Sequence, residues 1–292
     1  MDIFQYWFMF PVAIGVATCA MLSGIGGAAL FTPIFVLLFP LLGPDYVLSS
    51  TVAAIAAALI TQTFGFLSGF IGYQRRGLID YGLARRMHVI SVPVAMVGAL
   101  IATSINDAFL LAGYALLVLV LGAGLVRQGE PSAGQTDVPQ ELRFVVDRAG
   151  KEHRFVDPGR TTRGTLLTMA GAFLTGLVSV GIGEVTISQL TRRGVPIAVA
   201  AATSVLVVIV TVATASTTLA VQLIREGGLS AIPWNLLLWD IPGVLIGGQI
   251  GPRLQGRIRQ ITMQRAIGAL FFLLSIAMAY VAWLRFQGGS LH

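Results

Sequence analysis

Two glycine-rich breaks lie at corresponding places in the two halves of the chain, and their residues are the ones best suited to chemistry. The first break is Gly24-Ile25-Gly26-Gly27, and the second is Gly181-Ile182-Gly183-Glu184. Glycine permits a sharp reversal and leaves backbone N–H groups accessible. The helix that follows each break, from Ala28 or from Glu184, presents unpaired N–H donors and the positive end of its dipole. Two such helix ends, approaching from opposite faces of a membrane, would bind a small anion.

Hydroxyl and amide side chains near the breaks would supply further hydrogen-bond donors, and such a shell suits a tetrahedral or pyramidal oxyanion. For any single hydroxyl, packing inside the membrane is the better-supported role. The predicted substrate-binding residues are Ser23, Gly24, Gly26, Gly27, Ala28, Thr32, Thr51, Gln62, Ser179, Gly181, Gly183, Glu184, Thr186, Gln189, Thr203 and Ser204, with Ser49 and Ser50 as further hydroxyl donors.

Glu184 is the only acidic residue well inside a break that we expect at hydrocarbon depth. A charge at the bilayer centre costs about 2.5 to 3.5 kcal/mol on insertion scales, so such a residue usually has a partner or a function. One role is proton coupling, because an ionised Glu184 would repel an anionic substrate and its protonation would promote binding. The other role is capping of its own helix, where a carboxylate beside the first N–H groups is favoured. The sequence leaves both roles open.

The composition places these breaks in a lipid environment. Of 292 residues, 55% are hydrophobic and 11% are charged, whereas soluble domains have about 25% charged residues. Several apolar segments approach the roughly 20 residues that a helix needs to cross the hydrocarbon layer. His88, His153 and His292 are far apart, and no spacing of Cys and His indicates a metal site. We therefore expect an all-α polytopic membrane protein that is not an enzyme, has no cofactor or metal, and binds no nucleic acid.

The apolar segments divide the chain into two halves joined by a polar linker. Residues 1–126 form the first membrane repeat, 127–163 a cytoplasmic linker, 164–286 the second repeat, and 287–292 a tail. In the linker, Arg143 to Val146 and His153 to Val156 are spaced as the strands of a β-hairpin, but a solvated linker is the favoured interpretation. The apolar segments are residues 4–22, 28–39, 49–71, 87–105 and 109–126 in the first half, and 165–180, 184–191, 198–224, 235–251 and 264–284 in the second.

The two halves share landmarks in the same order, which indicates an internal repeat. Four landmarks recur at offsets of 149 to 157 residues. They are the glycine breaks, Thr51-Val52 with Thr203-Ser204, Val92-Pro93 and Gly98 with Ile241-Pro242 and Gly247, and Gly113 with Gly268.

The distribution of basic residues orients the repeats, because cytoplasmic loops collect Arg and Lys. On this assignment 17 of the 19 basic residues are cytoplasmic, only Arg225 and Arg285 lie outside, and both termini are periplasmic. Each repeat then has a helical hairpin, broken at its glycine motif, plus three transmembrane helices. Because three is odd, the second repeat is inverted relative to the first. Arg192 and Arg193 either draw anions toward the cytoplasmic entrance or only anchor the topology.

The Gly-Ile-Gly-Gly break with Pro33 nearby, repeated as Gly181-Ile182-Gly183, resembles the TauE/SafE family, the sulfite exporters. The similarity covers nearly the whole chain outside the linker, and the chain departs from the family pattern at Ala28 and Ala29 and from repeat symmetry at Glu184. The resemblance implies export of sulfite or a short organosulfonate such as sulfoacetate across the bacterial inner membrane. An anion channel, or a carrier for another small carboxylate or oxyanion, is the alternative. The expected partners are the small anion and the lipid bilayer, and a homo-oligomer is left open.

Overall fold

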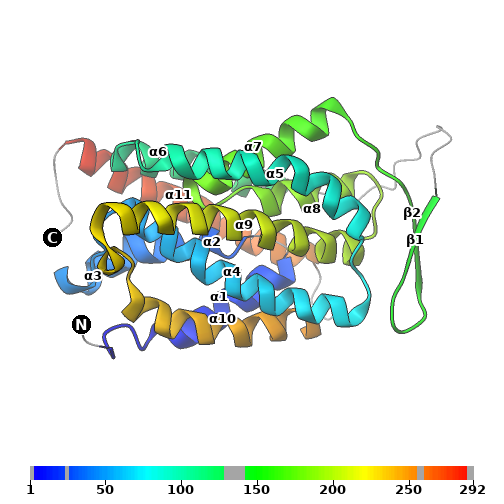
Figure 1. Ribbon diagram of the computed structural model, residues 1–292, viewed down its shortest axis with the longest axis horizontal. Coiled ribbons are helices and arrows are strands. Elements are labelled where there is room, and N and C mark those ends of the chain that lie inside the picture. Colours follow the sequence, from blue (N-terminus) through cyan, green and yellow to red (C-terminus); the bar gives the residue numbers. More distant parts are fainter. Residues whose placement is uncertain (1–2, 24–25, 128–141, 255–259, 288–292) are drawn as a thin grey trace.

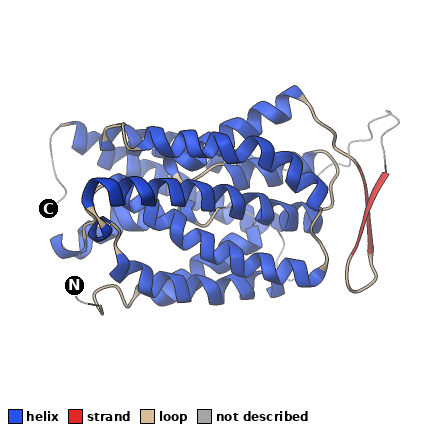
Figure 2. Ribbon diagram, in the orientation of Figure 1, coloured by secondary structure: helices blue, strands red, loops and turns tan. Residues whose placement is uncertain are grey.

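A computed structural model describes residues 3–23, 26–127, 142–254 and 260–287 as a bundle of helices with a β-hairpin at one end (Figure 1; Figure 2). Five helices are long and apolar enough, by length and composition, to cross a membrane. They are α4 (Thr51–Arg76), α5 (Tyr81–Ala102), α6 (Asp107–Arg127), α9 (Ile197–Gly227) and α11 (Gln260–Phe286). The predicted all-α polytopic membrane fold is confirmed.

In the first half, a shorter helical pair precedes the long helices. Helix α1 (Met9–Ser23) leads through the first break into α2 (Ala28–Pro33), which continues through a π-helical turn (Ile34–Leu38) into α3 (Phe39–Leu42). The π-helical turn directly follows Pro33, which has no N–H to give to the helix. A short 3-10 turn (Pro44–Tyr46) leads to Ser50, whose side chain caps α4 by accepting a hydrogen bond from the N–H of Ala53.

The second half has a similar order of helices, a shorter pair followed by three longer ones. Helix α7 (Thr162–Val178) leads through the second break into α8 (Ile182–Arg192), and α9 follows. After a 3-10 turn (Leu229–Ala231) come α10 (Trp234–Leu254) and α11. Helix α10 corresponds to the predicted crossing at residues 235–251, but it is not among the five long apolar helices. It has 21 residues, including the fully buried Asp240.

The first helix of each half packs against a helix of the other half. Helix α1 lies along α10, and α7 lies along α5, while α4 lies along α9 and α6 along α11. Glycines allow the close approaches: Gly247 of α10 faces the carbonyl oxygen of Ile14, and Gly98 of α5 faces that of Phe173. These two glycines are the landmarks that follow the corresponding prolines in the two halves. The same close helix packing at a glycine therefore occurs twice. In one case the glycine belongs to the second half and packs on the first, and in the other it belongs to the first half and packs on the second.

The linker contains a β-hairpin, so the favoured interpretation of a merely solvated linker is wrong for residues 142–156. Strands β1 (Leu142–Val146) and β2 (Glu152–Val156) pair antiparallel, with Leu142 opposite Val156. The hairpin is attached to the end of α4, because the N–H of Arg148 donates to the carbonyl oxygen of Arg76 at 3.0 Å.

Ion pairs hold the hairpin against α5. The Arg143 guanidinium lies 2.7 Å from one carboxylate oxygen of Asp157 and 3.2 Å from Asp80, and Arg86 also contacts Asp157, at 2.9 Å. Burial raises the pKa of Asp157, but the hydrogen bonds from the Gly159 N–H and Arg86, together with the charges of Arg143 and Arg86, outweigh it. The pKa of Asp157 therefore lies below its usual value.

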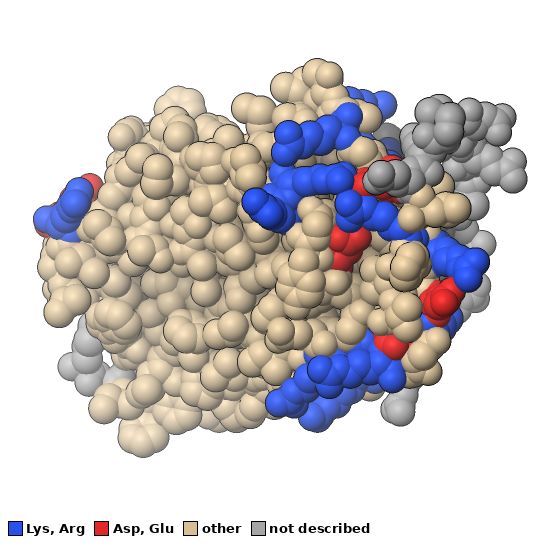
Figure 3. Space-filling view, turned by 45° about the vertical axis from the view of Figure 1, so that its right-hand side comes forward, with Lys and Arg blue, Asp and Glu red and all other residues tan. Residues whose placement is uncertain are grey.

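The charged side chains gather at the hairpin end of the bundle, as the space-filling view shows (Figure 3). The start of α1 and the end of α11 lie at the opposite end (Figure 1). There Arg285 pairs with Asp107 at 2.9 Å, joining the end of α11 to the start of α6.

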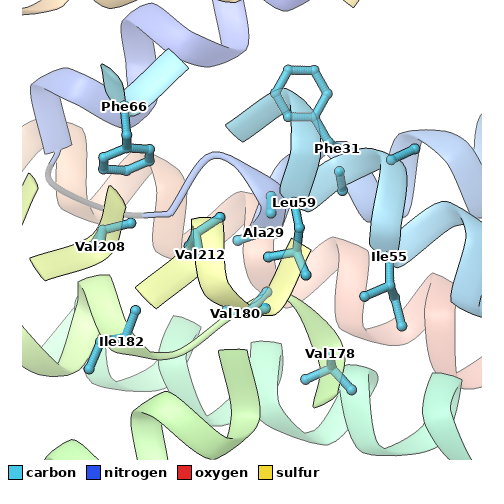
Figure 4. Packing of buried hydrophobic residues seen from close by; sticks show 14 of the residues in the cluster. Ala29, Phe31, Ile55, Leu59, Phe66, Val178, Val180, Ile182, Val208 and Val212 are labelled. Carbon is cyan, nitrogen blue, oxygen red and sulfur yellow. The ribbon is translucent and has the colours of Figure 1, made fainter. Parts of the chain in front are cut away.

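The described residues of the two breaks lie inside the apolar core. Figure 4 shows buried side chains of α2 (Phe31), of α4 (Ile55 and Leu59), and of the end of α7 and the turn after it (Val178 and Val180), and all of them belong to one hydrophobic cluster. Polar groups at the breaks are therefore surrounded by apolar side chains and must find partners within the protein.

Candidate functional site

The second break, together with the Ser179-Val180 turn that leads into it, is a sharp reversal, and position 181 accommodates only glycine. Ser179 adopts a left-handed conformation with φ of 67°, and Gly181 has φ of 140°. A Cβ atom at Gly181 would lie 2.7 Å from the carbonyl oxygen of Gly171. Helix α8 begins directly after it, at Ile182, so this reversal sets the position of Glu184 in the first turn.

The Glu184 side chain joins the two reversals. One carboxylate oxygen accepts a hydrogen bond from the N–H of Gly26 at 3.0 Å, and the other accepts from the N–H of Gly181 at 3.1 Å. The Glu184 residue is 6% exposed. Because Gly26 belongs to the first half and Gly181 to the second, the two breaks meet at a single carboxylate.

Two further N–H groups at the helix starts also have side-chain partners. The N–H of Ala28 donates to the side-chain oxygen of Gln62 at 2.6 Å, and that of Ile182 donates to the Thr175 hydroxyl at 2.8 Å. The sequence predicted unpaired donors here, but an N–H group left unpaired in an apolar interior costs about 1 to 3 kcal/mol. In this conformation, side-chain oxygens fill the places that were expected for a ligand.

A further hydrogen bond joins the two hairpins. The hydroxyls of Thr32 on α2 and Ser179 in the second break lie 2.9 Å apart, and both residues are buried. Ser204 of α9 donates to the carbonyl oxygen of Gly183 at 3.3 Å, which fixes the start of α8 against α9.

The structure brings most of the predicted site residues together. Gln189 points toward α7, where its amide donates to the Thr168 hydroxyl at 3.4 Å. The Thr186 hydroxyl is buried and has no hydrogen-bond partner among the described residues. The residues that meet around the two breaks are Gly26, Gly27, Ala28, Thr32, Gln62, Ser179, Gly181, Gly183, Glu184 and Ser204.

Two predicted residues lie elsewhere. The Thr51 hydroxyl accepts a hydrogen bond from Arg285 at 3.0 Å, in the ion-pair cluster at the end opposite the hairpin. The Thr203 hydroxyl accepts from the N–H of Asp80 at 3.0 Å, beside the hairpin. The side chain of Ser23 and the whole of Gly24 lie outside the described residues.

Sequence reasoning missed two residues that shape the site. Thr175 binds the first N–H of α8, and the Tyr114 hydroxyl donates to the carbonyl oxygen of Ala29 at 2.8 Å. A signal existed for each. Thr175 stands four residues before Ser179, one helical turn away, and Tyr114 carries the only hydroxyl in the apolar segment 109–126.

A cavity of about 470 Å³ connects Glu184 with the basic end of the bundle. One face of α8 lines this cavity along about 12 Å of helix. The residues on that face are 184, 185, 188, 189 and 192. Arg163 of α7 and Arg192 and Arg193 at the end of α8 complete the polar wall. Arg193 donates to neutral groups, the carbonyl oxygen of Pro158 and the Thr161 hydroxyl. Within the described part of the chain, Glu184 is the only acidic residue that lines this cavity.

The fold and the site define a polytopic membrane protein in which two buried chain reversals meet at its centre, an arrangement typical of secondary transporters. The family model described as Sulfite exporter TauE/SafE matches residues 9–278. The chain therefore belongs to the sulfite exporter TauE/SafE family, and the resemblance of its glycine breaks to that family is confirmed. Comparisons with curated proteins and with solved structures found no match. Membership in this family makes the protein an integral membrane transporter of a small anion.

Proposed function

We propose that this protein exports sulfite or a short organosulfonate, such as sulfoacetate, across the cytoplasmic membrane, and that the anion binds where the two breaks meet. One observation carries the proposal. The N–H groups of Gly26 and Gly181 come from different halves of the chain and converge on the two oxygens of one carboxylate. A position that accommodates two carboxylate oxygens between two amides also suits two oxygens of a sulfite or sulfonate group.

The two halves are proposed to be inverted repeats, with the hairpin end in the cytoplasm and both termini in the periplasm. The exchange of packing partners between the halves supports the repeat, since Gly98 packs on α7 and Gly247 packs on α1. The gathering of basic residues at the hairpin end supports the orientation, because positive charge is retained in cytoplasmic loops.

The cavity beside α8 is proposed as the cytoplasmic entrance for the anion. Its wall carries Arg163, Arg192 and Arg193, and a cleft lined by charges of one sign attracts ligands of the opposite sign. The cavity extends from these guanidinium groups at the basic end to Glu184 at the breaks. An anion that enters it would therefore arrive beside the amides of Gly181 and Gly26.

Proton coupling through Glu184 is the finer part of the proposal. An ionised Glu184 and an anionic substrate repel each other in the apolar interior, so protonation of Glu184 favours substrate occupancy. For a monoanion, uptake of one proton with each substrate keeps the charge of the occupied site unchanged.

Flux measurements in liposomes test the substrate assignment. Purified protein is reconstituted, and flux is compared for sulfite, sulfoacetate, sulfate and acetate, with glycerol and choline as the neutral and cationic comparisons. We expect a saturable flux that is fastest for sulfite or sulfoacetate. If choline or glycerol moves fastest, the proposed function is wrong. Anion flux that rises linearly without saturation supports the channel alternative instead.

The coupling role has its own test, the Glu184→Gln variant. In the native protein we expect anion flux to rise as the pH falls, and in the variant we expect it to be independent of pH. If the pH profile of flux is the same in both proteins, Glu184 does not couple protons to transport.

A further inference from the structure

The proposed anion site is already occupied in this conformation. The two Glu184 oxygens bind the amides of Gly26 and Gly181, and the neighbouring amides of Ala28 and Ile182 are bound by Gln62 and Thr175. A substrate cannot bind the Gly26 and Gly181 donors until the Glu184 side chain moves away. The other two acceptors are neutral, so Glu184 alone brings a carboxylate to the position of a substrate anion.

Helix capping explains only half of this geometry. A Glu at the third helical position commonly reaches back to the N–H of the residue that precedes the helix, and Glu184 does so with Gly181. Its second oxygen binds Gly26 in the other half of the chain, which capping of α8 does not require. At the corresponding position of the first half stands Gly27, which has no side chain. One residue of the second half therefore binds both breaks.

Space for a displaced side chain exists next to the site. Glu184 lines the cavity that also contains Arg163, Arg192 and Arg193, so a rotated Glu184 would enter a region of positive charge. The substrate is proposed to arrive through the same cavity. Displacement of Glu184 toward the arginines and arrival of the anion thus use one connected volume.

The ionisable groups around Glu184 come from three elements. They are Tyr114 of α6, Arg163 of α7, and Arg192 and Arg193 of α8. Helix α2 contains no ionisable residue. Helices α4 and α9 contribute Gln62 and Ser204 to this region, and their first ionisable residues beyond these, Tyr73 and Arg225, lie 11 and 21 residues further along the chain. Within the described residues, Glu184 is therefore the one acid at the site whose charge competes with a substrate.

We propose that the Glu184 carboxylate is an internal ligand of the anion site, and that a substrate anion binds by displacing it from the amides of Gly26 and Gly181. This inference rests on the proposed transport function and adds a mechanism of competition to it. When no substrate is bound, the carboxylate satisfies the two buried amides. When substrate is bound, its oxygens satisfy the same amides, so the cost of unpaired donors is avoided in both states.

Equilibrium binding to Glu184→Gln tests the competition. The variant retains the shape of the side chain but replaces a charged acceptor by a neutral amide, and hydrogen bonds to a charged group are roughly twice as strong as neutral ones. At pH 8, a pH chosen because alkaline conditions favour the ionised form of a carboxyl group, we expect the variant to bind sulfite about tenfold more tightly or better. Anaerobic calorimetry on the full-length protein in detergent measures this. A matched control is Glu152→Gln on the exposed hairpin surface, for which we expect unchanged affinity.

A spectroscopic readout follows the side chain directly. In the native protein, the infrared difference spectrum on adding sulfite should contain a shifted carboxylate band, and that band should be absent in Glu184→Gln. If the variant does not fold, Glu184→Asp replaces it, because a side chain shorter by one methylene cannot reach both amides and should also bind sulfite more tightly.

The outcomes separate this inference from the proposed function. If the native protein neither binds nor transports any of the anions, the proposed function fails. If the native protein transports sulfite, but affinity is unchanged or weaker in the folded Glu184 variant and the carboxylate band does not shift, the displacement is refuted while transport stands.

Discussion

The packing of α10 against α1 makes a prediction about Gly247 that can be worked out from distances. An added Cβ atom at Gly247 would lie 2.8 Å from the Cβ of Ala17 and still closer to the carbonyl oxygen of Ile14. Since the nearer of these atoms is backbone, Gly247→Ala requires the two helices to move apart. Overpacking of this kind costs about 1 to 3 kcal/mol. Gly98→Ala should behave alike, because its added Cβ would meet the backbone of Phe173.

Gly113→Ala is the matched control for this prediction. Gly113 lies within α6 and is exposed, and an added Cβ there meets no atom within 4 Å. The same change of residue should therefore stabilise the protein by up to about 1 kcal/mol, through helix propensity alone. Reversible unfolding in SDS, followed by circular dichroism, gives the free energies of unfolding. If Gly113→Ala and Gly247→Ala have equal effects, close helix packing is not the reason for glycine at position 247.

The remaining predictions concern the buried acids. Arg143→Met leaves Asp157 with Arg86 and removes the ion pair of Asp80. Breaking a fully buried pair costs about 3 to 5 kcal/mol, and because the Arg143 side chain is 27% exposed we expect a smaller loss of stability, about 2 kcal/mol, in thermal unfolding. Addition of Asp157→Asn should restore part of it. The pKa of Asp157 lies below its usual value, so its contribution to stability is present above the unfolded-state pKa and is lost as the pH falls through the folded-state pKa. The protection factors of residues 142–156 against hydrogen exchange, corrected for the intrinsic exchange rate at each pH, should therefore fall at acidic pH. Arg143→Met should move that fall to higher pH, and an unmoved profile would contradict the ion-pair explanation. Asp240 is fully buried, and among the described residues its carboxylate has one hydrogen-bond partner, Thr61 at 3.4 Å. Asp240→Asn should therefore unfold at the same or a higher temperature, and a large decrease would show that the carboxylate has an essential partner.

The sequence was sufficient to predict that the two breaks belong together, because their positions repeat and a transmembrane repeat brings equivalent residues to a common centre. It was not sufficient to identify the groups that bind the amides there. Gln62 reaches Ala28 across 34 residues, and Glu184 reaches Gly26 across 158. Such contacts depend on the rotation of each helix about its axis. A helix that is apolar on all sides has no polar face in its sequence, so its pattern does not reveal this rotation.

Thr51 and Thr203 show what the correspondence between the two halves does not predict. Both are landmarks of the proposed repeat; Thr51 is the first residue of α4, and Thr203 lies in the second turn of α9. Their partners, Arg285 and Asp80, lie at opposite ends of the bundle. Equivalence in sequence therefore predicted equivalent places in each half but not nearness to the central breaks.

The hairpin illustrates a different difficulty. Its alternating residues allowed a pair of strands, but an isolated two-stranded hairpin is marginally stable in water. Its docking depends on Arg143, which contacts Asp80 and Asp157, 63 residues before it and 14 after it. Local pattern alone could not show that these carboxylates would be present at the surface where the hairpin lies.

Two acids interrupt the correspondence between the halves, and both lie in contacts that cross from one half to the other. Thr211 donates to Ser91 at 2.8 Å, and the equivalent pair in the other direction is Thr61 with Asp240 at 3.4 Å. Glu184 likewise occupies the position that Gly27 has in the first half. If the proposed inverted repeats were chemically identical, the conformations open to the two sides of the membrane would be equal in energy by symmetry. An acid in only one half removes that equality. If the two conformations bury its carboxylate to different extents, its protonation shifts the equilibrium between them. The positions of Glu184 and Asp240 are therefore where we expect a preference between the two sides of the membrane to be set.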